Sequence, residues 1–297
     1  MTTTATTPVS AECAMADALE PLREAFEARL DAVLPSPGNA RDLVAAAMRE
    51  CSLAPGKRLR PLLLVLTAEG LGASRAAALE VACAVELVHA ASLVLDDLPC
   101  MDNAELRRGR ATLHLAFGED VAVLTAIALL SHAFGLVAAI DGVRPEVRNH
   151  LVTTLSQAIG VQGLVKGQLQ DLREGNGTRT VGEIAQTNQL KTGVLFTAIM
   201  DMACDLADAP ASKRTPLHHF AEELGQAFQL RDDLRDRDPS SGKDQGKDEG
   251  KTTLVALCGE TQVRRRLQGH VEAAQDYLDQ AFLRERTLSV LLQRLFA

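Results

Sequence analysis

Apolar residues recur at helical spacing along almost the whole chain. The segment 15–34 is typical, with apolar residues three or four positions apart at Leu19, Leu22, Phe26, Leu30 and Leu34. The sequence contains no alternation of apolar and polar residues long enough to predict a strand. Aromatic residues make up only 3% of it, whereas β-sandwiches and barrels are enriched in them. The pattern therefore predicts an all-α fold of about ten or more helices.

Proline, glycine and charged segments separate these helices. We expect helices at 15–34, 41–51, 59–71, 74–98, 103–116, 119–141, 145–174, 181–206, 213–237 and 260–295, with a break in the last. The longest irregular segment, 238–250, is rich in Lys, Asp and Gly, and loops of that length are often functional. We predict a frayed tail at 1–14 and one helical domain at 15–297.

Composition excludes several classes of protein. A hydrophobic fraction of 46% in 297 residues supports a large core, which excludes a disordered chain. A formal charge of −8 without basic blocks argues against nucleic-acid binding. Residues 1–10 carry no charged side chain and the six cysteines show no CxxC spacing, so we expect neither a secretory signal nor a disulfide scaffold. We therefore predict a cytoplasmic protein, and interpret the apolar run 121–140 as a buried central helix rather than a membrane span.

Two segments place clustered aspartates beside apolar helix. They are Asp96, Asp97 and Asp102 in the first segment, and Asp232, Asp233 and Asp236 in the second. Asp232 and Asp236 are one helical turn apart, so their carboxylates leave the same face. Pro99 is expected to bend the first segment, which allows Asp102 to return towards Asp96. Oxygen ligands of this kind suit Mg²⁺, which also binds water and substrate phosphates.

Basic residues occur at spacings suited to phosphate groups. They are Lys57 and Arg60, Arg107 and Arg108, Lys191, and the loop residues Lys243, Lys247 and Lys251. His89 precedes Asp96 by seven positions and therefore shares its helix face, which favours a contact with ligand. Cations beside paired carboxylates indicate a highly anionic ligand, with Mg²⁺ separating acid from phosphate.

The order of these motifs resembles that of the trans-polyprenyl diphosphate synthases. GKRLRP, ELVHAASLVLDD, DDLPCMD followed by LRRG, GQLQDL, LKTGVLF, FQLRDDLRD and GKDQGKDEGKTTL all occur in the family's order, over roughly residues 40–260. The phrasing PCMDNAELRRGRATLH is most similar to that of bacterial carotenoid-pathway geranylgeranyl diphosphate synthases. The resemblance implies an isoprenoid-synthase bundle of helices around a deep central cavity, and a homodimer.

The resemblance also implies roles for individual residues. Three Mg²⁺ ions would be bound by Asp96, Asp97, Asp102, Asp232, Asp233 and Asp236. The allylic diphosphate would contact Arg107, Lys191, Lys243 and Lys251, supported by Gln168, Asp171, Thr192 and Gln229. Isopentenyl diphosphate would be bound by Lys57, Arg60, His89 and Arg108. The catalytic set would be Asp96, Asp97, Asp102, Lys191, Asp232 and Asp233.

Small residues before the first motif favour a long product. In the family, bulky side chains just before that motif form the floor of the prenyl pocket, whereas here Ala91 and Ser92 occupy the fifth and fourth positions before Asp96. Geranylgeranyl diphosphate is therefore the expected product. The alternatives are a farnesyl diphosphate synthase, a class I terpene cyclase and a regulatory subunit, although a regulatory subunit would be expected to have lost acidic residues. The sequence departs from the family at Pro55, at Asn103-Ala104 and at Arg235, which could alter metal affinity without removing a ligand.

Overall fold

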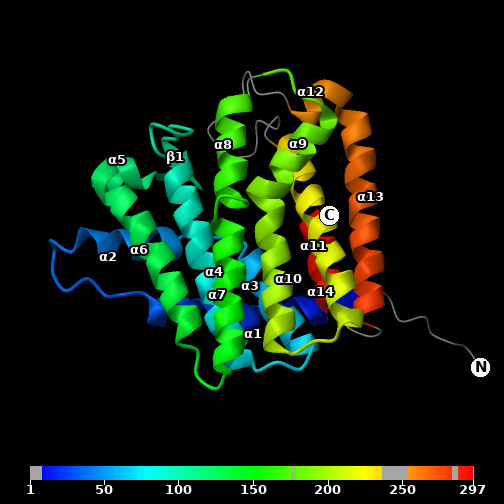
Figure 1. Ribbon diagram of the computed structural model, residues 1–297, viewed down its shortest axis with the longest axis horizontal. Coiled ribbons are helices and arrows are strands. Elements are labelled where there is room, and N and C mark those ends of the chain that lie inside the picture. The colour runs from blue at the N-terminus through cyan, green and yellow to red at the C-terminus, as the bar shows by residue number, and fades with distance from the viewer. Residues whose placement is uncertain (1–8, 176, 236–252, 283–286, 297) are drawn as a thin grey trace, which may run out of the picture.

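The computed structural model describes residues 9–175, 177–235, 253–282 and 287–296, and the side chains from residue 19 onward (Figure 1). Its helices are α1 (Val9–Val33), α2 (Leu43–Ser52), α3 (Leu59–Gly70), α4 (Arg75–Asp96), α5 (Leu113–Phe117), α6 (Glu119–Ala138), α7 (Pro145–Ile159), α8 (Leu164–Glu174), α9 (Val181–Asn188), the π-helix η1 (Gln189–Gly193), α10 (Val194–Leu206), α11 (Ala211–Arg235), α12 (Leu254–Cys258), α13 (Glu260–Ala281) and α14 (Thr287–Phe296). The all-α prediction is confirmed.

The long helices stand roughly upright in Figure 1, with α5 and α6 at one flank, α13 at the other and α1 crossing behind the base. Helix α4 packs against α3 and α6, and α11 packs against α10 and α13. Ala, Val and Leu occupy nearly every turn of α4, so this helix is buried on most of its circumference. The core between these helices includes Leu64, Leu87, Phe196, Ile199 and Phe220, each less than 2% exposed.

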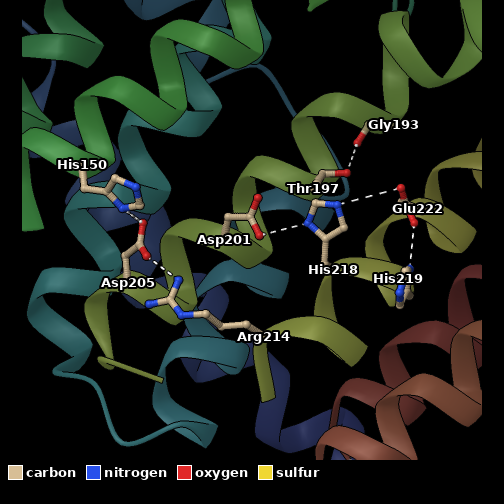
Figure 2. Close-up of polar contacts among 9 residues, drawn as sticks. All are labelled: His150, Gly193, Thr197, Asp201, Asp205, Arg214, His218, His219 and Glu222. Atoms are coloured by element: carbon tan, nitrogen blue, oxygen red, sulfur yellow. Dashed lines mark hydrogen bonds and ion pairs between the residues drawn. The ribbon is translucent and has the colours of Figure 1, made fainter. Parts of the chain in front are cut away.

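A polar stripe on α10 ties the bundle together away from the aspartate motifs (Figure 2). Thr197, Asp201 and Asp205 lie one turn apart on this helix. The buried Asp205 carboxylate accepts hydrogen bonds from His150 Nδ1 of α7 at 2.7 Å and from Arg214 Nη1 of α11 at 2.5 Å. Nearer the surface, Asp201 Oδ1 contacts His218 Nδ1 at 3.2 Å. These contacts fix α10 between α7 and α11.

The prediction of a helix at 103–116 is wrong. The chain instead forms a hairpin of two short strands, β1 (Leu106–Arg107) and β2 (Arg110–Ala111), before α5. The two turn residues, Arg108 and Gly109, have φ angles of 54° and 76°. Left-handed residues at both turn positions are typical of two-residue hairpin loops and cannot continue a right-handed helix.

Two further helices differ from the prediction. The expected helix 145–174 is divided into α7 and α8 by a turn at 160–163, where the backbone approaches so closely that a Cβ at Gly163 would lie 2.0 Å from the carbonyl oxygen of Ala158. The expected helix 181–206 contains the π-helix η1, which widens one turn. Such π-segments are frequently found at functional sites.

The prediction that 121–140 is a buried central helix is also wrong. Helix α6 lies at the edge of the bundle, with one apolar face in the core and another exposed at Val123, Leu124 and Ile127. By length and composition both α4 and α6 could cross a membrane, but the core helices of water-soluble proteins meet the same criteria. An exposed apolar face of this kind is typical of a contact site, but its composition does not show whether a protein or a membrane covers it.

Candidate active site

The first acidic motif forms where α4 ends. Asp97 caps the helix, and the loop folds back so that the Asp102 N–H donates to the Asp96 carbonyl oxygen at 2.9 Å. The helix ends before Pro99, so Pro99 stands in a loop rather than in a bent helix. The fold thus brings Asp96, Asp97 and Asp102 together, as the sequence suggested.

The carboxylates of this motif are crowded in a buried place. Burial raises the pKa of Asp96 to about 6, and the charges of Asp102 and Asp97 add to the rise while Lys191 and Arg107 oppose it. Burial likewise raises the pKa of Asp97, although Arg107 Nε donates to its Oδ1 at 3.0 Å. Buried acids that repel one another are stabilised by added positive charge.

The second motif is oriented by a chain of hydrogen bonds. Thr192 Oγ1 of η1 donates to Gln229 Oε1 at 3.1 Å, and Gln229 Nε2 donates to Asp233 Oδ1 at 2.9 Å. Asp232, from the same turn of α11, is electrostatically coupled to Lys57 and Arg60 of the loop and helix opposite. Asp236, Lys243 and Lys251 lie outside the described residues.

Lys191 joins the first motif to α8. Its Nζ donates to Asp171 Oδ2 at 2.8 Å. Burial lowers the pKa of Lys191, but the carboxylates of Asp171, Asp96 and Asp102 outweigh that effect and raise it overall, so the ammonium stays charged. On α8, both amide atoms of Gln168 are buried without a hydrogen-bond partner in the described structure. A buried amide in this state is suited to bind a ligand.

Close backbone contact between α8 and η1 holds Lys191 in place, and we expect Gly167→Ala to disrupt it. A Cβ at Gly167 would lie 2.4 Å from the Lys191 backbone nitrogen. Gly167→Ala should therefore lower the free energy of unfolding by about 1–3 kcal/mol, as overpacking does. Gly269→Ala is the matched control, because Gly269 lies within α13 and a Cβ there would meet nothing within 4 Å. That change should stabilise by about 0.5–1 kcal/mol. Urea unfolding measures both, and equal effects would contradict the close contact.

A second group of basic residues lies around Arg60 and Arg108. Burial, with a smaller contribution from Arg108, lowers the pKa of Arg60 to about 10, although Glu86 opposes the shift. The Arg60 guanidinium carbon lies 4.7 Å from the centre of the Phe196 ring, and Arg60 Nε has no hydrogen-bond partner in the described structure. Burial and four neighbouring arginines lower the pKa of His89 well below its usual value, which keeps it neutral. Burial, together with Arg231 and Arg235, lowers the pKa of Lys57. Lys57, Arg60 and Arg108, with His89 beside them, form what we call the cationic corner. It is suited to bind an anion.

The aspartates fit Mg²⁺ by their chemistry. Within the described ranges, no three His, Cys, Asp or Glu side chains are arranged to hold a metal ion by themselves. The first motif nevertheless offers carboxylate oxygens in a buried, mutually repelling group, and the second offers Asp232 and Asp233 on adjacent positions of α11. Mg²⁺ binds through one or two carboxylates and completes its shell with water and phosphate oxygens. The residues therefore fit a metal that enters with an anionic substrate.

Sequence reasoning missed one network beside this site. Arg58, the middle arginine of GKRLRP, is 4% exposed and pairs with Glu27 of α1 and Glu86 of α4. Glu27 lies 31 positions before Arg58, so local spacing gives no sign of the pairing. The one sequence signal was that GKRLRP contains a third basic residue, Arg58, although only Lys57 and Arg60 were expected to bind phosphate.

Comparisons with known proteins agree with this geometry. Residues 41–281 match the family described as polyprenyl synthetase. A geranylgeranyl diphosphate synthase of Pantoea ananas is 53% identical over 267 residues, which cover 89% of this chain and 88% of that protein. A farnesyl diphosphate synthase of Geobacillus stearothermophilus is 41% identical, with coverage of 77% and 79%. The crystal structure of an FPP/GFPP synthase from Zymomonas mobilis superposes with a TM-score of 0.84 at 32% identity, covering 96% of this chain and 98% of that one. The two aspartate motifs, the cationic corner and this match over most of the chain lead to one conclusion: the chain belongs to the polyprenyl synthetase family.

Proposed function

We propose that this chain is a Mg²⁺-dependent prenyltransferase that condenses isopentenyl diphosphate with an allylic diphosphate, and that its main product is geranylgeranyl diphosphate. The observation that carries the proposal has three parts: the first aspartate motif lies beside Lys191 of η1, the second is tied to Thr192 of the same π-helix through Gln229, and Arg60, Arg108 and Lys57 form a cationic corner. Two anion sites of different composition suit two diphosphate substrates. We further propose that residues 15–297 act as one domain.

In this proposal the allylic diphosphate lies between the two aspartate motifs, whose six carboxylates, including that of Asp236, would hold three Mg²⁺ ions. Bound there, Mg²⁺ would neutralise the negative charge that develops on the departing diphosphate. Lys191 and Arg107 donate to the same group, as do Lys243 and Lys251. Gln168 supplies its buried amide, while Asp171, Thr192 and Gln229 hold their neighbours in position. Because Lys191 and Arg107 are already held by Asp171 and Asp97, these two donors would stabilise the ionising C–O bond more than the ground state.

Isopentenyl diphosphate binds at the cationic corner, through Lys57, Arg60, His89 and Arg108. Its double bond attacks the allylic cation at C1 and forms the new carbon–carbon bond. This attack leaves the positive charge on the isopentenyl unit. The carbon next to that charge then loses a proton to the departed diphosphate, which restores a double bond. An aliphatic pocket for the prenyl chain would exclude water, which would otherwise capture the cation.

We propose that α4 limits the length of the product, and expect Ser92→Phe to shorten it. Ser92 is partly exposed one turn before Asp96, whereas Ala91 is fully buried. One helical turn spans about 5.4 Å, close to one isoprene unit. Ser92→Phe should therefore shift the main product from C20 to C15 with little loss of stability, and Ala91→Phe should also lower the melting temperature because it overpacks the core. Chromatography of the dephosphorylated products checks the shift, and an unchanged C20 product in Ser92→Phe would contradict this assignment.

A homodimer is also part of the proposal. Leu115 of α5 and Val123, Leu124 and Ile127 of α6 form an exposed apolar surface on one flank. A second copy would bury this surface and relieve its contact with water. The predicted cytoplasmic location agrees with such an assembly. Replacing Leu124 and Ile127 with Glu should yield monomers in sedimentation, and a wild-type monomer at micromolar concentration would contradict the dimer.

Diphosphate release tests the reaction class. With Mg²⁺, the protein should release diphosphate only when geranyl diphosphate and isopentenyl diphosphate are both present, and EDTA should abolish release. A class I terpene cyclase would release diphosphate from the allylic substrate alone. A regulatory subunit would release none under any of these conditions. A farnesyl diphosphate synthase would stop at C15.

A further inference from the structure

The loop that carries Lys57 is held by a buried arginine with partners on two helices. Arg58 Nε donates to Glu27 Oε1 at 2.7 Å and Nη2 donates to Glu27 Oε2 at 3.2 Å, a two-pronged contact with α1. Its Nη1 donates to Glu86 Oε1 of α4 at 2.7 Å, and Nη2 also donates to the Ala54 carbonyl oxygen at 3.0 Å. A single guanidinium therefore connects α1, α4 and the start of the loop.

The backbone at Arg58 is held in an uncommon conformation. Its φ and ψ angles of 49° and 31° are left-handed, at the N-cap of α3. A non-glycine residue adopts this conformation only when its surroundings impose it. The turn separates Lys57 from Arg60, so it determines the directions of both side chains. Arg108 also contacts this loop, because its Nη1 donates to the Pro55 carbonyl oxygen at 3.0 Å.

Glu86 also faces the cations of the corner. It is 5% exposed, and its charge raises the pKa values of Arg58, Arg60 and Arg108, against the effect of their burial. Three guanidinium groups that repel one another are thus gathered around one buried carboxylate. Because Glu27 also pairs with Arg58, the negative charge of Glu86 stabilises the positive charges of Arg60 and Arg108 as well as that of Arg58.

From this geometry we propose that Arg58, Glu27 and Glu86 form a positioning network that holds Lys57 and Arg60 in the orientation needed to bind isopentenyl diphosphate. The inference rests on the proposed function. It adds residues that touch no substrate, and it assigns α1 a part in the site, although Glu27 lies before the segment 41–281 that matches the family. Each member acts through the loop and through Arg60, not on the reacting atoms.

Steady-state kinetics of Glu27→Gln and Arg58→Gln test the network. We expect the KM for isopentenyl diphosphate to rise about tenfold in each, as expected for displacing one charge-assisted contact. The KM for farnesyl diphosphate should stay within about twofold, because Lys191 and the aspartates are held by other elements. Arg58→Lys keeps the charge but loses the planar fork, and should recover only part of the affinity.

The matched control is Glu80→Gln. Glu80 of α4 pairs with Arg29 of α1, so it joins the same two helices without contacting the loop. This variant should leave both KM values unchanged. If Glu27→Gln and Arg58→Gln lower only the melting temperature, or raise both KM values equally, the network is structural and the proposal is wrong. Should Arg58→Gln fail to fold, Glu27→Gln decides alone, because Glu27 is 33% exposed and tolerates the change.

The wild-type protein, measured in the same series, separates this proposal from the proposed function. A wild type that consumes no isopentenyl diphosphate would refute the function itself. A wild type that condenses both substrates, with variants whose KM for isopentenyl diphosphate is unchanged, would refute only the network.

Discussion

Alanine at Asp97 or at Asp233 is expected to lower turnover on the order of 10³-fold, the effect of removing a preorganised group that stabilises developing charge. Asp97 is buried at the end of α4 and pairs with Arg107, and Asp233 accepts from Gln229. Each belongs to a different motif, so each variant should weaken a different part of the proposed Mg²⁺ cluster. The KM for isopentenyl diphosphate should change much less than kcat.

Diphosphate release at several Mg²⁺ concentrations measures these effects. Partial recovery at high Mg²⁺ is expected if the loss is one of metal affinity. Asp276→Ala is the matched control, because Asp276 is an exposed aspartate on α13 and should retain full activity. Near wild-type turnover in both Asp97→Ala and Asp233→Ala would contradict the metal assignment.

Methionine at Arg60 is expected to raise the KM for isopentenyl diphosphate on the order of 10²-fold, because a buried guanidinium that binds phosphate is lost. The same change should raise the melting temperature. Burial lowers the pKa of Arg60 to about 10, so the charge of Arg60 destabilises the folded state at every pH below about 10. Methionine keeps the contact with Phe196 and removes that penalty.

The two effects of Arg60→Met together separate function from structure. If Arg60 were needed only for packing, the variant would have both a lower melting temperature and a weaker affinity for isopentenyl diphosphate. If Arg60 binds the anion, the variant should have a weaker affinity and a higher melting temperature. Arg265→Met, on the exposed side of α13, should leave both the KM and the melting temperature unchanged. An unchanged KM for isopentenyl diphosphate in Arg60→Met would remove Arg60 from the substrate site.

Local sequence signals were sufficient for most of the fold and for the acidic motifs. Helical periodicity predicted the bounds of α3 and α4 to within two residues and the first residue of α13, because each helix buries apolar side chains along its length. Asp96 and Asp102 were predicted to lie together because of a helix bend at Pro99; they do lie together, but a loop that begins after Asp96 brings them there. The hairpin at 106–111 was missed because helical spacing was given more weight than Gly109, whose left-handed conformation favours a turn.

Contacts between distant parts of the chain could not be inferred in this way. The pairing of Arg58 with Glu27 joins α1 to the loop before α3, and no periodicity connects them. The exposed face of α6 was predicted to be buried because α6 carries apolar side chains on all its faces. The sequence alone does not say whether the core of the same chain or a partner covers them. The close contact at Gly167 similarly depends on where α8 crosses η1.

The most direct test of the central claim is product analysis with farnesyl diphosphate as the allylic substrate. Purified protein with isopentenyl diphosphate and Mg²⁺ should convert farnesyl diphosphate to geranylgeranyl diphosphate, with C20 as the dominant product after dephosphorylation and chromatography. Accumulation of C15 from geranyl diphosphate, with no C20 formed from farnesyl diphosphate, would contradict the account.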